Sequence, residues 1–494
     1  MSVDIRCFAI VVILVGCGSG GEQSDEAATR TTQERVNKSK KPIQIESEAV
    51  VAIKALGGIV RRRHDRAVDY VSLAGTRVTD EELAHLTEFT NLKRLNLHKT
   101  EITDAGLEHL DELISLRSLD ISDTNVTGSG LAHLKGLIYL ESLSVFNTKT
   151  TDADMASLSR LFKLRLLDLS CTEITDAGLG HIEWLTYLDT LDLSGTSITD
   201  TGLENLKELA FLERLDLADT QVTGVGLVHL KKLIWLDTLN VSNTQFTDAG
   251  LMHLQSLGKI FNLNLSGTQL TDSGIAHLKA LTDLGLLDLS ATRITDAGLV
   301  HLQDLAMISE LNLSGTQLTN DGLVYLGALA DLRRLDVADT QITDAGLLHL
   351  KEMTNLVDLS LAGTEISDAG LINIQGLPCL NLHNTRITDA GLAILAEWPI
   401  TDIEFGPVEP DMLNEFCGLV LSKTQVTDAG LPHLKRLAMD VDLDLSDTLI
   451  TDKGMDELKA ALPNHYFRGR TIWATRIPIP SREFRPNQPN EPVT

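Results

Sequence analysis

A threonine returns at a fixed interval along most of this 494-residue chain. The interval is 24 residues over the first thirteen positions, and it then changes to 21, 39 and again 24. The series consists of Thr76, Thr100, Thr124, Thr148, Thr172, Thr196, Thr220, Thr244, Thr268, Thr292, Thr316, Thr340, Thr364, Thr385, Thr424 and Thr448. It divides residues 68–462 into about sixteen units. Repeats of this length are typical of chains whose units stack on one another, so the separate globular domains that length alone would suggest are not expected.

Each unit has the hydrophobic pattern of one short strand followed by one short helix. In the unit that begins at Leu284, Leu287 and Leu289 alternate as in a strand, and the apolar residues after Gly298 have helical spacing. Burying seven apolar side chains contributes roughly 10–20 kcal/mol, whereas ordering the 24 residues of a unit costs about 1–2 kcal/mol each for the backbone alone. A single unit therefore cannot fold, and its stability must come from contacts with its neighbours.

The pattern LxxLxLxxTx(I/L) resembles the leucine-rich repeat, with threonine where that family usually has asparagine or cysteine. The longer form, TDAGLxHLxxLxxLxxLDLSGT, is similar to the ribonuclease-inhibitor-like repeats of bacterial, planctomycete-type proteins. The resemblance covers about 80% of the chain. It implies an α/β solenoid in which a curved parallel sheet forms the concave face and short helices form the convex face. With strands about 4.8 Å apart, sixteen of them would trace an arc of roughly 75 Å.

The recurring phrase ITDAGLVHL is interpreted as scaffold. The threonine series occupies the place where the resemblance implies an inward side chain that hydrogen-bonds the backbone of adjacent turns. Thr295 suits the helix N-cap, Asp296 suits the first helical turn, and Gly298 allows close approach to the neighbouring unit. The first unit reads TDEE instead, so Thr79 and Glu82 are predicted to form a capping box.

Ten of the fourteen histidines share one place in this phrase: His85, His109, His133, His181, His229, His253, His277, His301, His349 and His433. Helices of adjacent units pack roughly 8–10 Å apart, whereas the ligands of one zinc ion must each approach it to about 2.0–2.1 Å. The column is therefore a poor metal site. We expect a packing role with a hydrogen bond to a neighbouring turn, and no metal or cofactor.

The strand face is where we expect binding. Four residues before each threonine, the side chain points out of the sheet, and this column contains Asp120, Asp168, Asp192, Asp216, Asp288, Asp336 and Asp444. Asp168, Asp192 and Asp216 belong to consecutive units and would stack about 5 Å apart, an arrangement that raises carboxyl pKa values or attracts cations. Two residues before the threonine, His98 and Phe146 interrupt a column of mostly serine and alanine. We predict that these residues bind a basic or repetitive partner. The alternative is a row of short polar side chains that hydrogen-bond along a solvated sheet.

The N-terminus predicts an exported and anchored protein. Residues 7–16 form an apolar run that is too short to span a bilayer as a helix, and residues 14–17, LVGC, resemble the bacterial lipobox, whose cysteine is diacylated. We predict a signal peptide over residues 1–17 with lipidation at Cys17, and a flexible tether over 18–44. An ordinary signal peptide or an uncleaved anchor is the alternative.

Both ends of the array are expected to carry caps, because terminal repeats would otherwise expose their core. The N-terminal cap is predicted over residues 45–67, with a helix that Ser47 opens and Gly57 ends. Residues 463–494 are predicted to form a cap strand, around RTIW, and a flexible tail. The N-terminal cap also contains a basic patch that contacts anionic lipid or is simply solvated: Arg61, Arg62, Arg63 and Arg66.

Composition disfavours several functions. A net charge of −27 repels phosphate backbones, so no nucleic-acid partner is expected. Cys171, Cys379 and Cys417 have unrelated spacings, which indicates neither a disulfide framework nor a metal site, and most of them are expected to be buried small hydrophobes. A uniform ladder of carboxylates on an open face offers no cleft that would set the pKa values of two acids apart, so an enzyme is not expected.

The sequence therefore predicts a non-enzymatic, lipid-anchored leucine-rich repeat protein of the cell envelope, monomeric, which binds an unidentified protein or envelope polymer through its concave face. A structural or self-associating envelope spacer remains the main alternative, and an enzyme that uses the concave carboxylates is a further one. The irregular stretch at residues 399–416 interrupts the array. It is interpreted either as a projecting loop, and hence a second candidate binding site, or as one degenerate repeat.

Overall fold

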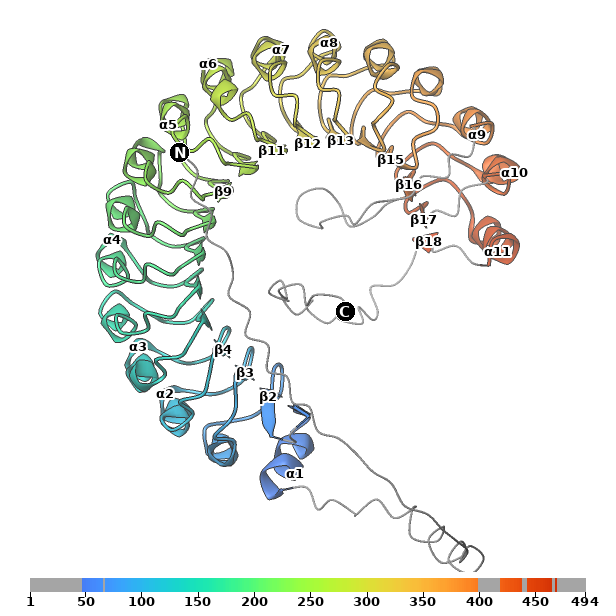
Figure 1. The fold of residues 1–494 in the computed structure, drawn as a ribbon. Helices are drawn as coiled ribbons and strands as arrows, with labels where there is room; N and C mark the ends of the chain where they lie inside the picture. The colour runs from blue at the N-terminus through green and yellow to red at the C-terminus, as the bar shows by residue number, and fades with distance from the viewer. Residues whose placement is uncertain (1–46, 65–66, 399–417, 438–441, 464–466, 469–494) are drawn as a thin grey trace, which may run out of the picture. The chain divides into compact units, whose positions relative to one another are not determined.

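The computed structural model describes residues 47–64, 67–398, 418–437, 442–463 and 467–468. Two units, Met1–Val51 and Ala52–Thr494, divide the chain. The repeats lie in the second unit, where the strands line the inner side of a curve and the helices line its outer side (Figure 1). This is the solenoid that the repeat pattern predicts.

Each turn contributes one short strand, usually of three residues. The strands are β1 (Ile59–Arg62), β2 (Val68–Ser72), β3 (Arg94–Asn96), β4 (Ser118–Asp120), β5 (Ser142–Ser144), β6 (Leu166–Asp168), β7 (Thr190–Asp192), β8 (Arg214–Asp216), β9 (Thr238–Asn240), β10 (Asn262–Asn264), β11 (Leu286–Asp288), β12 (Glu310–Asn312), β13 (Arg334–Asp336), β14 (Asp358–Ser360), β15 (Cys379–Asn381), β16 (Gly418–Val420), β17 (Asp442–Asp444) and β18 (Phe467–Arg468).

The helices that return the chain to the sheet are short α-helices and 3₁₀ helices, the latter numbered η1 to η11. The α-helices are α1 (Glu48–Ala55), α2 (Asp104–Leu107), α3 (Gly128–Leu131), α4 (Asp176–Leu179), α5 (Asp248–Leu254), α6 (Asp272–Ile275), α7 (Asp296–Leu299), α8 (Leu323–Leu326), α9 (Asp389–Leu395), α10 (Leu431–Leu434) and α11 (Asp452–Ala461). The 3₁₀ helices are η1 (Glu81–Glu88), η2 (Glu108–Leu110), η3 (Ala132–Gly136), η4 (Asp154–Ser157), η5 (Gly202–Leu206), η6 (Val225–Leu230), η7 (Ala276–Ala280), η8 (Val300–Leu302), η9 (Gly346–Leu350), η10 (Gly370–Asn373) and η11 (Asp428–Gly430).

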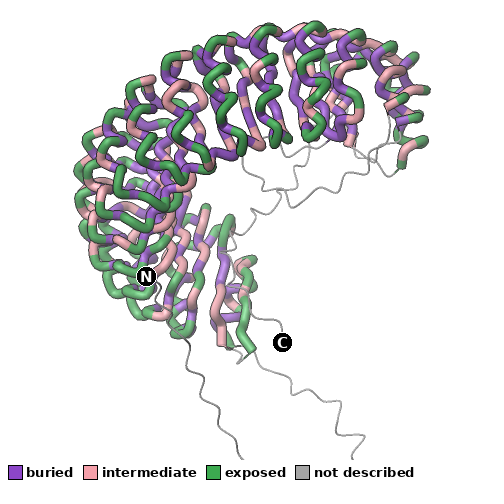
Figure 2. The backbone as a smooth tube through the Cα atoms, turned by 45° about the horizontal axis from the view of Figure 1, so that its top comes forward, coloured by how far each residue is buried: buried purple, intermediate pink, exposed green. Residues whose placement is uncertain are grey.

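Strands β2 to β18 pair in parallel and in sequence order, each with the strand of the next turn. The central leucine of each repeat strand is buried and faces the central leucine of its neighbour, as Leu263 faces Leu287. Because the helices bury a second row of leucines against the same interior, a continuous core follows the curve (Figure 2). Register survives both changes in repeat length, since Leu359 pairs with Leu380 and Leu380 with Leu419. The extra or missing residues are therefore absorbed outside the sheet.

The N-terminal part contains the predicted helix and one strand that the sequence did not predict. In α1, the Ser47 hydroxyl accepts a hydrogen bond from the Val50 N–H at 3.4 Å, and Gly57 follows with φ +87°. Strand β1 then pairs antiparallel with β2, which places the Arg61 guanidinium 4.8 Å from the centre of the Tyr70 ring. Two of the arginines predicted to form a basic patch thus belong to a sheet edge. Arg66 lies outside the described residues, as do the signal, the tether, residues 399–416 and RTIW.

The threonine series is buried apart from the half-buried Thr76, but its hydrogen bonds differ from the expectation. Each hydroxyl donates to the carbonyl three residues earlier in its own turn, as Thr292 does to Leu289 at 2.6 Å. The residue just before each threonine has a left-handed backbone, as Ala291 does with φ +52°. This sharp turn brings the hydroxyl back onto its own strand. The prediction that these threonines hydrogen-bond the backbone of adjacent turns was therefore wrong.

Adjacent turns are instead joined by the aspartate of the TDAGL phrase. Asp272 Oδ1 accepts a hydrogen bond from the Thr295 N–H at 2.8 Å, and Asp272 Oδ2 accepts one from the Thr295 hydroxyl at 2.7 Å. A β-carbon on Gly298 would lie 2.6 Å from Asp272 Oδ1, which confirms that this glycine is needed for close approach to the neighbouring turn. Thr295 also caps α7 by accepting from the Ala297 N–H at 3.2 Å, as predicted. We call this contact the aspartate–threonine clamp.

None of the helices in the described part of the chain combines the length and the apolar character that a bilayer crossing needs.

Candidate binding site on the concave face

The aspartate column lies where the sequence placed it, at the end of each strand on the concave face. Register brings Asp168 directly opposite Asp192, and Asp192 directly opposite Asp216, on the neighbouring strands β6, β7 and β8. Asp288 and Asp336 lie farther along the same column, separated from this group and from each other by asparagines. Asp120 lies two strands before Asp168. Asp444 ends β17 and pairs with Val420, so the structure brings together three of the seven aspartates of this column.

Each aspartate of this column has a structural role in its own turn. The Oδ1 atom accepts a hydrogen bond from the backbone N–H two residues later, at 3.0 Å from Ser170 to Asp168 and at 2.9 Å from Ser194 to Asp192. This bond ends the strand and starts the left-handed turn, as in an Asx turn. Asparagines in the same column make the same bond, as Asn264 does with Ser266 at 2.9 Å. Turn chemistry thus explains why the column is mostly aspartate and asparagine, but it does not explain the negative charge.

The second carboxylate oxygen is free to contact neighbours along the sheet. Asp168 Oδ2 accepts from the Ser144 hydroxyl at 2.7 Å, and Asp216 Oδ2 accepts from the Asn240 amide at 3.0 Å. Asp192 makes no such lateral bond to any described residue. Its two hydrogen bonds both come from Ser194, and both reach Oδ1. Oδ2 of Asp192, at the centre of the trio, is therefore the oxygen best placed to accept a hydrogen bond from a partner.

Burial and neighbouring charges raise the pKa of two members of this group. Burial in the concave face, with the neighbouring charges of Asp216 and Asp168, raises the pKa of Asp192 to about 6, although hydrogen bonds from Ser194 oppose the shift. Burial likewise raises the pKa of Asp216. A site that stacks carboxylates at neighbouring strands favours a partner that supplies positive charge, because such a partner relieves the repulsion.

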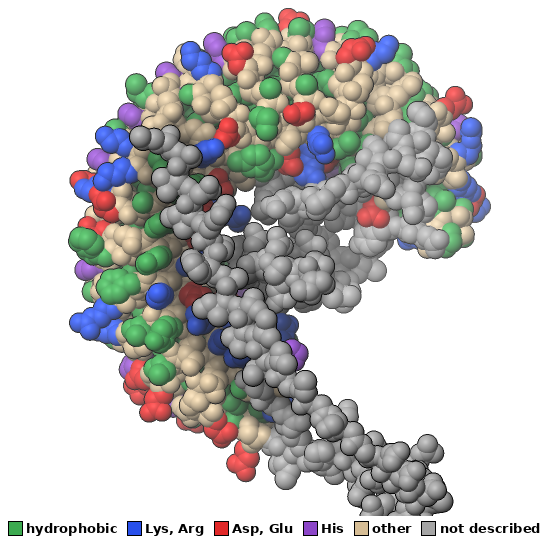
Figure 3. All heavy atoms as spheres, viewed as in Figure 1, with side chains coloured by type: hydrophobic (Ala, Val, Ile, Leu, Met, Phe, Trp, Pro, Cys, Tyr) green, Lys and Arg blue, Asp and Glu red, His purple; other side chains and the backbone are tan. Residues whose placement is uncertain are grey.

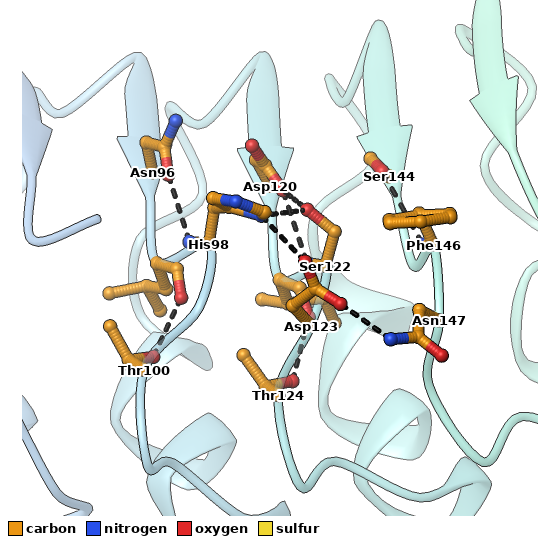
Figure 4. Close-up of polar contacts among 12 residues, drawn as sticks. Asn96, His98, Thr100, Asp120, Ser122, Asp123, Thr124, Ser144, Phe146 and Asn147 are labelled. Carbon is orange, nitrogen blue, oxygen red and sulfur yellow. Dashed lines mark hydrogen bonds and ion pairs between the residues drawn. The ribbon is translucent and has the colours of Figure 1, made fainter. Parts of the chain in front are cut away.

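His98 and Phe146 lie half-buried two strands apart, on either side of the turn that contains Ser122 (Figure 4). The Ser122 hydroxyl donates to Asp120 Oδ1, so its lone pair is left to accept from His98 Nδ1 at 2.9 Å. Because the serine proton points at the aspartate, His98 is not placed as a base that could activate this serine. Asn147 donates to Asp123 in the same row, which extends the hydrogen-bonded surface toward Phe146.

A second polar region of the concave face was missed by the sequence analysis. Six residues before the threonine, Glu310, Arg334 and Asp358 come from the consecutive strands β12, β13 and β14, and Arg334 Nη1 lies 2.8 Å from Glu310 Oε1. Burial raises the pKa of Asp358 to about 6, against the lowering effect of Arg334. Asp336 and Asp358 also line a hollow of about 450 Å³ over β13 to β17. The sequence does contain a sign of this region, because charges of alternating sign recur one repeat apart at this position. The more regular aspartate column was interpreted instead.

The histidine column lies on the helices, away from the strands, and its members are exposed or half-buried. His133 Nδ1 lies 3.2 Å from Asp111 Oδ1 of the preceding turn, and His277 Nδ1 lies 3.3 Å from the Gln255 amide. These two contacts fit the predicted hydrogen bond to a neighbouring turn. Within the described ranges, no group of three or more His, Cys, Asp or Glu side chains is arranged to hold a metal ion.

Two cysteines differ from the expectation of buried, unmodified hydrophobes. Cys379, at the start of β15, is buried but disulfide-bonded. Cys171 is free and exposed, in the left-handed position before its threonine. Cys417 lies outside the described residues.

Comparison with known proteins agrees with the geometry. The family described as leucine-rich repeat region matches residues 139–466, and a second leucine-rich repeat family matches residues 90–110 and 112–134. No curated protein matches the chain at a significant level.

Among solved structures, the chain is similar to an internalin from Listeria monocytogenes, with 22% identity, a TM-score of 0.54, and coverage of 68% of this chain and 94% of the internalin chain. It also aligns with a leucine-rich repeat protein from Leptospira interrogans, with 18% identity, a TM-score of 0.46, and coverage of 78% and 80% of the two chains. At these identities the first likeness shows the fold alone. Since the family match covers more than half of the chain and the strands, turns and core follow the repeat, this protein belongs to the leucine-rich repeat proteins.

Proposed function

We propose that this protein is a non-enzymatic binding protein whose concave face captures a basic segment of another protein. The observation that carries the proposal is the trio Asp168, Asp192 and Asp216, aligned on neighbouring strands. Asparagine serves the turn equally well elsewhere in the column, so three adjacent negative charges are not required for folding. Burial, to which the neighbouring charges of Asp216 and Asp168 add, instead raises the pKa of Asp192, which is a cost that a basic partner would offset.

The test is the triple substitution Asp168→Asn, Asp192→Asn and Asp216→Asn. Each asparagine keeps an Oδ1 acceptor for its turn, so the variant removes three charges while it preserves the fold. The matched control is Asp304→Asn, Asp321→Asn and Asp331→Asn, which removes the same charge from exposed positions outside the column. The assay is binding of each full chain to fluorescent lysine- and arginine-rich peptides at low and physiological salt.

We expect the concave variant to bind at least about tenfold more weakly than the control, because each charge pair lost at a half-buried site costs on the order of 1 kcal/mol. Equal binding by both variants would show that net charge alone attracts the peptide, and that the concave trio has no specific role.

We also propose that the chain is exported and anchored by lipid at Cys17, with the segment boundaries predicted from the sequence, and that its repeats are of the planctomycete type. The disulfide at Cys379 supports export, since disulfides persist in oxidising compartments. Metabolic labelling with palmitate should mark the wild-type chain and not Cys17→Ala. Unlabelled wild-type chain that is recovered free of membranes would exclude the anchor. The stretch at 399–416 remains the second candidate site.

A further inference from the structure

The large, exposed aromatic side chains among the described residues lie on one flank of the solenoid. This is the flank where the chain leaves each helix and begins the next strand, and six consecutive turns, those of β5 to β10, each expose at least one aromatic ring there. We call these residues the aromatic strip: Tyr139, Phe162, Trp184, Tyr187, Phe211, Trp235 and Phe261, each 46–65% exposed. They are seven of the twenty aromatic residues of the chain. Figure 3 shows hydrophobic side chains gathered along this arm of the curve.

The strip is continuous because neighbouring turns are bonded beside it. The backbone N–H of Asp189 donates to Arg165 at 2.9 Å, and that of Phe261 donates to Asp237 at 2.8 Å. At the middle of the strip the Tyr187 and Phe211 rings stack, with centroids 6.3 Å apart and planes 5° from parallel. Lys163 lies 5.7 Å from the centre of the Tyr187 ring. Neighbouring side chains therefore already occupy ring faces at the centre of the strip.

This geometry decides which kind of partner fits. A sugar polymer stacks on open ring faces, and Tyr187 has neighbours at its ring. A membrane surface rich in anionic lipid would need a surplus of positive charge on this flank, and the ion pairs described below leave none. An apolar protein surface meets neither objection.

The charges on this flank are largely paired within it. Arg165 Nη2 lies 2.6 Å from Asp189 Oδ2, Lys232 Nζ lies 2.8 Å from Glu208 Oε1, and Lys259 Nζ lies 3.2 Å from Asp283 Oδ2. A surface with internally paired charges can face its own copy without opposing like charges. It provides no unbalanced charge that would select a strongly basic or acidic partner.

The exposed apolar area also fits a protein interface. Aromatic side chains bury about 150–250 Å² each, so seven that are 46–65% exposed present roughly 600–950 Å². A typical monomer's largest apolar patch is about 300–600 Å², and a stable interface buries about 800 Å² on each partner. The strip thus exceeds what a monomer usually leaves in water and matches what a dimer needs.

We propose that the aromatic strip is a self-association surface, through which two copies of this chain pack flank to flank. In a two-fold arrangement the same patch meets itself, so the stacked Tyr187 and Phe211 at its middle lie near the axis. The concave faces of both copies remain open, and binding there is independent of this contact.

The test is sedimentation equilibrium of the full chain with Cys17→Ala in every sample, so that no acyl chain contributes. The chain with the unchanged aromatic strip should dimerise with a dissociation constant of about 10 µM or lower. The strip variant Trp184→Glu, Phe211→Glu and Trp235→Glu should raise that constant at least about a hundredfold, because the buried centre of an interface carries most of its binding energy. The control Met252→Glu, Leu348→Glu and Ile372→Glu adds the same charge at equally exposed apolar positions on the helices and should change it less than about threefold.

Salt distinguishes this contact from binding at the concave face. Two copies of net charge −27 repel one another, so screening should tighten the dimer as salt rises, whereas capture of a basic peptide should weaken. A wild-type chain that stays monomeric at about 100 µM in high salt overturns the proposal. Equal dimerisation by the strip variant, or equal loss in the helix control, also overturns it. Failure of the dimer leaves the concave-face experiment unaffected.

Discussion

The aspartate–threonine clamp predicts that two damaging substitutions should compensate one another. The chain already contains one such exchange. Where the aspartate is replaced by Gly128, the glycine of the next turn is replaced by Asp154, and Asp154 Oδ2 now accepts from both the Thr151 N–H at 2.8 Å and the Thr151 hydroxyl at 2.7 Å. A β-carbon on Gly128 would lie 1.4 Å from Asp154 Cγ, so the two carboxylates compete for one space. Either turn can supply the carboxylate, but both together cannot.

We therefore expect Asp272→Gly with Gly298→Asp to be far more stable than either change alone. Asp272→Gly removes two hydrogen bonds to a carboxylate and adds a helical glycine, which costs about 2–4 kcal/mol. Gly298→Asp forces a second carboxylate into occupied space, where a β-carbon alone already comes within 2.6 Å of Asp272 Oδ1, and this costs about 3 kcal/mol or more. The double variant restores one carboxylate to the Thr295 N–H and should lose only about 1 kcal/mol.

Native-state hydrogen exchange on the full chain measures this locally, which matters because long repeat arrays do not unfold in one step. The amides around Thr295 should exchange about thirty to a thousand times faster in Asp272→Gly, and less than about tenfold faster in the double variant, since 1.4 kcal/mol corresponds to a factor of ten. The Thr103 amide, bonded at 2.7 Å to Asp80 in a distant turn, provides an internal control. If the two single effects simply add in the double variant, the shared space is not what couples them, and the clamp is misinterpreted.

Three further predictions concern single positions. Thr292→Val should cost about 1–2 kcal/mol, because the Leu289 carbonyl loses its 2.6 Å donor inside the core; an unchanged exchange rate at the neighbouring amides would contradict this. Ala291→Gly should stabilise its turn by about 1 kcal/mol, because Ala291 has φ +52° and glycine adopts that conformation without strain; urea unfolding monitored by exchange at that turn tests the sign. The pKa of Asp192 is raised in the folded chain to about 6, so the folded form binds more protons than the unfolded one and stability should fall as pH rises from about 4 to about 6. In Asp192→Asn that fall should be smaller, and an identical pH profile would show that Asp192 does not contribute.

The fold could be predicted from the sequence because the strand period and the helix period of each repeat allow few alternative structures. Leucines such as Leu287 and Leu289 alternate as strands do, and the fixed 24-residue interval aligns each strand with the next. The left-handed residue before each threonine could also have been predicted, since glycine, asparagine and aspartate, which tolerate that conformation, fill most of these positions. Strand β1 could not, because it contains the arginine-rich sequence IVRR and none of the repeat pattern.

The site was predictable only in part, for a physical reason. The sequence shows which side of a strand a residue occupies, so Asp168, Asp192 and Asp216 were correctly placed together. It does not show which hydrogen bonds each carboxylate already makes, so the Asx turn at Oδ1 and the role of the TDAGL aspartate were missed. The aromatic strip was missed because its members, such as Trp184 and Phe211, occupy slightly different positions in successive units. They converge on one flank only when the turns are stacked.

The aspartate–threonine clamp makes the two ends of the array chemically different. Each aspartate reaches forward to the threonine of the next turn, so the first turn has no predecessor to supply a carboxylate and uses its own Glu82, whose Oε2 accepts from the Thr79 N–H at 2.8 Å. At the other end, the Thr451 N–H still donates to Asp428 Oδ1 of the preceding turn at 2.8 Å, while Asp452, the next carboxylate of the series, is exposed. Among the described residues, the clamp is therefore complete within the first turn, whereas the last turn ends on a carboxylate that clamps no following threonine. The threonine of a turn duplicated after the last one could hydrogen-bond Asp452 directly. A turn added before the first one would require Glu82 to be replaced, so chains of this kind can lengthen far more readily at the C-terminal end of the array than at the N-terminal end.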